Sequence, residues 1–155
     1  MPPSRNSLPT RFLQVRRAVL QIAPVYLDAR ATWEKLKAMA DIAVADGAEV
    51  LTWGESLIPG YPGWIAVDSS ETQKPLYARY WDQAVTLDGP LVADIRECAR
   101  RHKVMIVAGV AERAGGSTYA TTLTIGRDGS LLGRHRKIKP TWRQRTLSIR
   151  TGPRR

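Results

Sequence analysis

Apolar and polar residues alternate in blocks along the first third of the chain, and these blocks predict a strand, a helix and a second strand. A short apolar run at 18–22 indicates a buried strand that ends before a proline. Asp28 is a suitable N-cap for a helix over 29–46, and Gly47 stands where the residue after a helix end is expected. The next apolar run, 49–53, gives a second strand. This part therefore predicts a crossover unit, right-handed by the general rule.

The rest of the apolar pattern predicts two helices followed by a meander of three strands. Ser69 or Ser70 is able to cap a helix that continues to about residue 85, and Gly89-Pro90 opens another helix. The three expected strands cover 103–110, 119–125 and 131–139. Gly115-Gly116 is the expected turn between the first two, and Asp128-Gly129 is the expected hairpin turn before the third. Helices alternate with strands early and strands follow one another late, which predicts an α/β fold.

One carboxylate follows the second strand directly, at the start of a loop that is rich in glycine and proline. Glu55 ends the apolar run, and the loop then contains Ile58-Pro59-Gly60-Tyr61-Pro62-Gly63-Trp64. Proline fixes φ and glycine permits positive φ, so we expect this loop to have one defined shape. Apolar strands seldom finish on a charge except at a sheet edge or in a cleft, which makes this carboxylate a candidate catalytic group. The alternative is a solvated loop residue without a role in catalysis.

Two motifs resemble those of a known enzyme family. The residues Trp53-Gly54-Glu55 and Ile58-Pro59-Gly60-Tyr61-Pro62 are similar to the first active-site motif of the nitrilase family, within the carbon–nitrogen hydrolase superfamily. The segment Gly133-Arg134-His135-Arg136-Lys137-Ile138-Lys139-Pro140-Thr141 resembles the catalytic-lysine segment of that family. The two motifs stand in the family's order, and the resemblance covers residues 16–145.

The resemblance implies an α-β-β-α sandwich of the nitrilase type and a hydrolysis that uses a Glu, a Lys and a Cys. A cysteine thiolate attacks the carbon of a nitrile or amide, and water then hydrolyses the covalent adduct. Glu55 matches the general base, and Lys137 matches the cation that stabilises charge on the substrate. Strand alternation places Lys139 on the same face as Lys137, so spacing leaves both open, and the motif favours Lys137.

Two features depart from the family pattern. A second glutamate that orients the lysine is matched here by Gln144, whose amide is able to hydrogen-bond but does not offset a charge. The family's nucleophilic cysteine lies downstream of the lysine segment, and no cysteine follows Lys137 in this sequence. The single Cys98 precedes that lysine and belongs to the apolar side of a predicted helix. We expect it to be a packing residue.

The remaining candidates concern a substrate pocket. Trp53, Tyr61 and Trp64 are candidates for its walls, and the alternative is that these aromatic residues pack the stiff loop itself. His135, in the lysine strand, is either a pocket residue or a surface residue. His102 follows the last turn of a helix, so we expect it to interact with the helix dipole rather than to take part in catalysis.

The net charge of +10 is concentrated at the two ends of the chain. Residues 1–17 carry four arginines and no acid, and residues 127–155 carry ten basic residues against one aspartate. A basic tail is able to bind polyanions without specificity, but the slightly acidic body at 18–126 argues against a nucleic-acid-binding fold. The sequence contains no metal-ligand spacing, no cofactor motif and no apolar stretch of membrane-spanning length. A cytoplasmic protein without metal or cofactor is expected.

These observations predict a disordered leader at 1–14, the N-terminal part of a nitrilase domain at 15–145 and an unrelated basic tail at 146–155. Full-length relatives implied by the resemblance hydrolyse nitriles to carboxylic acid and ammonia and form homo-oligomers. As written, the chain is expected to be truncated and inactive because it lacks the nucleophile. We also expect an open sheet edge and an exposed apolar face. The alternative function is a non-enzymatic fragment or an interaction subunit of nitrilase oligomers.

Overall fold

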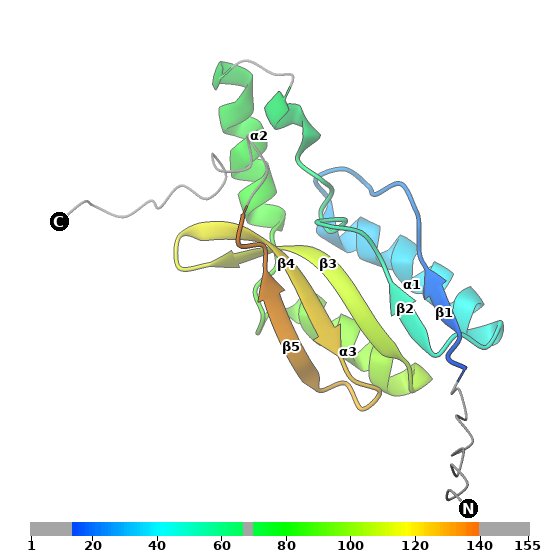
Figure 1. The fold of residues 1–155 in the computed structure, drawn as a ribbon. Helices are drawn as coiled ribbons and strands as arrows, with labels where there is room; N and C mark the ends of the chain where they lie inside the picture. The colour runs from blue at the N-terminus through cyan, green and yellow to red at the C-terminus, as the bar shows by residue number, and fades with distance from the viewer. Residues whose placement is uncertain (1–13, 67–69, 140–155) are drawn as a thin grey trace, which may run out of the picture.

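The computed structural model describes residues 14–66 and 70–139, and Figure 1 shows their fold. One five-stranded sheet has the order β1-β2-β3-β4-β5. Its strands are β1 (Arg17–Val19), β2 (Val50–Thr52), β3 (Met105–Ala114), β4 (Ser117–Ile125) and β5 (Leu131–Arg136). The first three strands run parallel, and β4 and β5 pair antiparallel, so the sheet is mixed.

Two helices cover one face of this sheet, and a third stands beyond one end of the strands. They are α1 (Ala29–Ala45) and α3 (Pro90–His102) behind the sheet and α2 (Ser70–Gln83), which follows the short 3₁₀ helix η1 (Gly63–Ala66). The side chain of Asp28 accepts a hydrogen bond from the amide of Ala31, and Gly47 follows the helix end with φ of +87°. The expected α/β class and the expected ends of α1 are confirmed.

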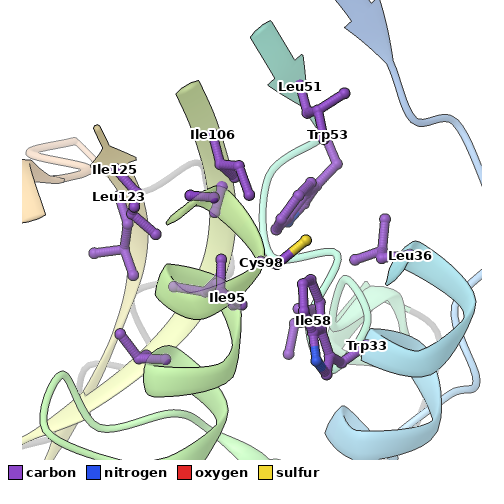
Figure 2. Close-up of a cluster of buried hydrophobic side chains, with 14 of the residues drawn as sticks. Trp33, Leu36, Leu51, Trp53, Ile58, Ile95, Cys98, Ile106, Leu123 and Ile125 are labelled. Atoms are coloured by element: carbon purple, nitrogen blue, oxygen red, sulfur yellow. The ribbon is translucent and has the colours of Figure 1, made fainter. Parts of the chain in front are cut away.

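The hydrophobic core lies between the sheet and the two helices behind it. Figure 2 shows its centre, where side chains of α1, α3 and three strands meet (Trp33, Leu36, Leu51, Trp53, Ile95, Cys98, Ile106, Leu123, Ile125). The rings of Trp33 and Trp53 have centroids 6.3 Å apart. Burying one large apolar side chain stabilises a fold by roughly 1.5–3 kcal/mol. This cluster therefore fixes the end of β2, from which the loop with the candidate carboxylate departs.

All five strands differ in extent from those expected, and the smaller differences are in β2 (Val50–Thr52, expected 49–53) and β4 (Ser117–Ile125, expected 119–125). β1 ends at Val19 rather than at residue 22, because the amide of Gln21 bonds to the carbonyl of Val19 in a tight local turn. β3 begins at Met105 and continues to Ala114, beyond the expected end at 110, because nine consecutive residues pair with β4. β5 ends at Arg136 rather than at 139.

The face of the sheet opposite α1 and α3 carries no helix along most of its length in the described part of the chain (Figure 1). On the edge strand β1, Val19 is 68% exposed. Within the described residues β1 pairs only with β2, so this sheet edge is open as expected, whereas the expected exposed apolar face stays a prediction. None of the helices that the structure describes is long and apolar enough to cross a membrane. The tail at 146–155, Gln144 and nearly all of the leader at 1–14 lie outside the described residues.

Candidate active site

Glu55 and Lys137 stand 82 residues apart in the sequence and meet in an ion pair. The ammonium group of Lys137 donates to Oε1 of Glu55 at 2.9 Å and to Oε2 at 3.1 Å. The side chain of Glu55 is 42% exposed and that of Lys137 is 29% exposed. Two opposite charges are therefore held at hydrogen-bond distance and remain accessible to a small molecule.

Two hydrogen bonds to the backbone of β3 hold the loop of Glu55 against this strand. Before the carboxylate, the indole N–H of Trp53 donates to the carbonyl of Gly109 at 3.2 Å. After the carboxylate, the carbonyl of Ile58 accepts a hydrogen bond of 2.7 Å from the amide of Ala111. Glu55 lies between these two anchors, which gives it a defined position relative to the sheet.

The close approach of this loop to β3 depends on a glycine. A Cβ atom added to Gly109 would lie 2.0 Å from the carbonyl oxygen of Gly54, far inside any normal contact. Ser56, directly after Glu55, is buried and has φ of +50°, a left-handed conformation that is costly for a residue other than glycine. Gly109 thus lets the loop lie directly on β3, and the left-handed Ser56 turns the chain next to the carboxylate.

Lys137 continues the pairing of β5 with β4 by one residue. Its amide donates to the carbonyl of Ala120 at 2.9 Å, and Ala120 pairs with Ala111 of β3. Because side chains alternate along strands, Lys137, Ala120 and Ala111 share the face of the sheet opposite α1 and α3. The lysine thus reaches Glu55 across the face that these helices leave open.

The pair combines a proton acceptor with a cation in one place. A carboxylate is able to take a proton from a nucleophile or from water, and an ammonium group stabilises negative charge that develops on a substrate atom. Within the described residues, no group of three or more His, Cys, Asp or Glu is arranged to hold a metal ion. The arrangement suits acid–base chemistry on a small molecule.

The four pocket candidates have different environments. Trp53 lies in the core beside Cys98 (Figure 2), and Trp64 is buried with its ring edge-on to Tyr80, at a centroid distance of 6.4 Å. Tyr61 is 48% exposed. His135 is exposed on β5, two residues before the paired lysine. Their role as pocket residues stays a prediction.

Two other candidate residues lie on α3. Cys98 is 3% exposed, and burial raises the pKa of its thiol, which makes it a poor nucleophile. Its position in the core agrees with the packing role expected from the sequence. The Nε2 atom of His102 lies 2.8 Å from Oδ1 of Asp41, so this histidine connects α3 to α1. Lys139, the alternative lysine, is exposed.

Sequence reasoning missed two buried polar groups near the site. Burial raises the pKa of the Tyr80 hydroxyl, against a smaller lowering by its hydrogen bond with Ser56, the residue that follows the candidate base. Glu112 is fully buried in β3 and accepts hydrogen bonds from Thr121 and Arg136. The signal for Glu112 was a single acid in the mostly apolar strand β3, together with the two arginines of the later strand β5.

The sequence of this chain matches a known protein family and several characterised relatives. A model of the family described as carbon-nitrogen hydrolase matches residues 16–153. An aliphatic nitrilase from Rhodococcus rhodochrous is 40% identical over 131 residues, which are 84% of this chain and 36% of that protein. An arylacetonitrilase from Aspergillus niger is 38% identical, over 86% of this chain and 40% of that protein. The match of the family model runs past residue 145, so the expected domain end there stays a prediction.

Solved structures show the same fold. An amidase from Nesterenkonia sp. superimposes with a TM-score of 0.64 at 18% identity, over 90% of this chain and 49% of that chain. A carbon-nitrogen hydrolase from Helicobacter pylori G27 gives a TM-score of 0.62 at 18% identity, over 90% of this chain and 45% of that chain. The chain spans about half the length of these structures and less than half that of the two nitrilases.

Proposed function

The chain belongs to the carbon–nitrogen hydrolase family, and on that premise we propose that it supplies the general base and the cation of a site that hydrolyses a small nitrile. The observation that carries this proposal is the ion pair of Glu55 and Lys137. The choice of a nitrile over an amide rests on the two curated relatives, which are named as nitrilases. The likeness to an amidase, at 18% identity, concerns the fold alone.

In the proposed reaction Glu55 accepts the proton of a cysteine thiol, and the thiolate attacks the nitrile carbon. Negative charge develops on the nitrile nitrogen, where the ammonium group of Lys137 stabilises it. Glu55 gives that proton to the nitrogen, which leaves a neutral thioimidate. It then takes a proton from a first water, whose attack expels ammonia and leaves a thioester, and afterwards from a second water, whose attack releases the acid and frees the thiol. Each residue thus acts through the atoms that face each other in the ion pair.

The thiol belongs, in this proposal, to the part of the relatives that the present sequence does not span. The only cysteine here, Cys98, is buried on α3. A structure of the Nesterenkonia amidase carries acrylamide on an active site cysteine. We infer that the present chain alone does not turn over nitriles and that it acts once such a cysteine is supplied. We also propose that the protein acts in the cytoplasm as a homo-oligomer.

A chimeric enzyme tests this function. The residues of this chain that align with the Rhodococcus rhodochrous nitrilase would replace the matching 131-residue stretch of that enzyme, and ammonia release from an aliphatic nitrile would be measured. We expect the folded chimera to release ammonia. The substitutions Glu55→Gln and Lys137→Met should each lower kcat about 10²–10⁴-fold, the usual contribution of a positioned acid–base group.

Glu34→Gln is the matched control, because Glu34 is an exposed, ion-paired acid on α1, away from the loop. This variant should keep the activity of the chimera. A folded chimera whose ammonia release is unchanged by Glu55→Gln and Lys137→Met would show that the pair is not the reacting centre.

A further inference from the structure

Strand β5 buries too little apolar surface to fix its register against β4. Its six residues, Leu131–Arg136, are exposed or half-buried, and none is fully buried. The ladder contains an irregularity between Thr124 and Ile125, close to the start of β5. Because a slip of one residue turns every side chain of a strand to the other face, such a strand needs another device to hold its register.

A buried carboxylate on β3 holds β5 through an ion pair. The side chain of Glu112 is 1% exposed and accepts two hydrogen bonds from Arg136, at 3.0 Å from Nε and 2.5 Å from Nη2. Thr121 of the intervening strand β4 donates to the same carboxylate at 2.8 Å. The guanidinium of Arg136 also lies 3.8 Å above the ring centre of Tyr119. Arg136 is therefore held by a bidentate ion pair and an aromatic face together.

Arg136 immediately precedes Lys137, and strand alternation directs the two side chains to opposite faces of the sheet. Arg136 reaches Glu112 on one face, and Lys137 reaches Glu55 at 2.9 Å on the other. A slip of β5 by one residue would turn Arg136 toward Glu55 and leave a buried carboxylate without its partner, which is strongly unfavourable.

We propose that Glu112 is a positioning residue: by holding Arg136 it fixes the register of β5, so that Lys137 and not a neighbouring cation meets Glu55. The end of β5 needs this selection because it is rich in cations (Arg134, Arg136, Lys137, Lys139). Arg136 is the main partner of Glu112 because the planar guanidinium binds both carboxylate oxygens, whereas Arg134 makes one longer contact of 3.4 Å.

This inference rests on the proposed function only for what the positioned lysine does, and its test needs no turnover. The whole chain would be acylated at limiting reagent, and the rate at each lysine followed by mass spectrometry. Glu112→Gln and Arg136→Gln should each raise the rate at Lys137 about fivefold, the factor that the loss of an ordinary ion pair represents. Lys37 of α1 and Lys103 after α3 should keep their rates.

Arg134→Gln is the matched control, since Arg134 reaches the same carboxylate at 3.4 Å from an exposed position but does not adjoin Lys137. It should leave the rate at Lys137 unchanged, and Glu112→Asp should restore part of the protection. Wild-type acylation of Lys137 in folded Glu112→Gln and Arg136→Gln chains would overturn the proposal. An equal rise at all lysines would also overturn it, because that marks general loosening.

Should Arg136→Gln fail to fold by circular dichroism, because it leaves the buried carboxylate without its main partner, the Glu112→Gln chain decides the question, since it leaves no buried charge and Arg136 is 30% exposed to water. An inactive chimera would count against the proposed function alone. Unchanged acylation of Lys137 in the folded variants would count against the positioning role alone.

Discussion

At the scale of single residues, two glutamates near the end of β5 have opposite environments. Glu55 is 42% exposed and pairs with Lys137, whereas Glu112 is 1% exposed and pairs with Arg136. An exposed pair opens to a substrate at little cost, because such pairs contribute about 0–1 kcal/mol. A buried pair does not open so readily, since breaking it leaves an uncompensated charge. The first carboxylate is suited to react and the second to hold structure.

Acid should weaken the fold through Glu112. Burial raises the pKa of this carboxyl, but hydrogen bonds from Arg136 and Thr121 outweigh it, so the pKa lies below its usual range. A depressed folded-state pKa stabilises the fold at pH above about 4.3, and this stabilisation is lost as the pH falls further toward the folded-state pKa. Urea unfolding at several pH values should show the free energy of unfolding falling more steeply for the wild type than for Glu112→Gln. Parallel curves would contradict this assignment.

Cys98 should behave as a packing residue. Its thiol is 3% exposed and its pKa is raised by burial, so a thiol reagent such as Ellman's should react with the unfolded chain and hardly at all with the native one. Cys98→Ala should lower the free energy of unfolding by about 1 kcal/mol through the small cavity it leaves. Rapid labelling of the native chain would contradict the core placement.

At the scale of elements, the position of the Glu55 loop depends on its contact with β3. Gly109→Ala would place a methyl group 2.0 Å from the carbonyl oxygen of Gly54, so the loop has to move. We expect this substitution to lower the free energy of unfolding by about 1–3 kcal/mol or more, as overpacking does. Gly133→Ala on β5 is the matched control, because its nearest neighbour lies 3.9 Å away. Equal chemical-denaturation midpoints for the two variants would show that the contact is not tight.

Elements with local signals were predictable from the sequence, and elements that depend on distant partners were less so. Helix α1 follows from Asp28 and Gly47, which act within one turn of the chain. The end of β3 was misplaced because Glu112 resembles a strand-ending charge until its partners on β4 and β5 are known. The pairing of Glu55 with Lys137 came from the resemblance of two motifs, since spacing alone left Lys139 open.

At the scale of the whole molecule, the described chain leaves apolar surface uncovered at the β1 edge. A groove of about 400 Å³ runs between β1 and α1, and its lining includes three exposed apolar side chains, Val19, Met39 and Ile42. Exposed apolar surface beside an open strand edge promotes association between chains.

Val19→Lys should therefore reduce self-association, because it places a charge on the exposed edge strand. Light scattering against concentration should fall several-fold relative to the wild type, whereas Val19→Ile, which keeps the position apolar, should scatter as the wild type does. Equal scattering by all three chains would show that this edge does not drive association.

The central claim is that this fold brings Glu55 and Lys137 into direct contact, and a zero-length cross-link tests it most directly. Carbodiimide activation joins a carboxylate to an amine only where the two touch. The internal reference is the pair of Lys37 and Glu34, whose charged atoms lie 4.0 Å apart. Mass spectrometry of the treated chain should identify an amide bond between Glu55 and Lys137. Formation of the reference cross-link without this bond, or with Lys139 joined to Glu55 instead, would contradict the account.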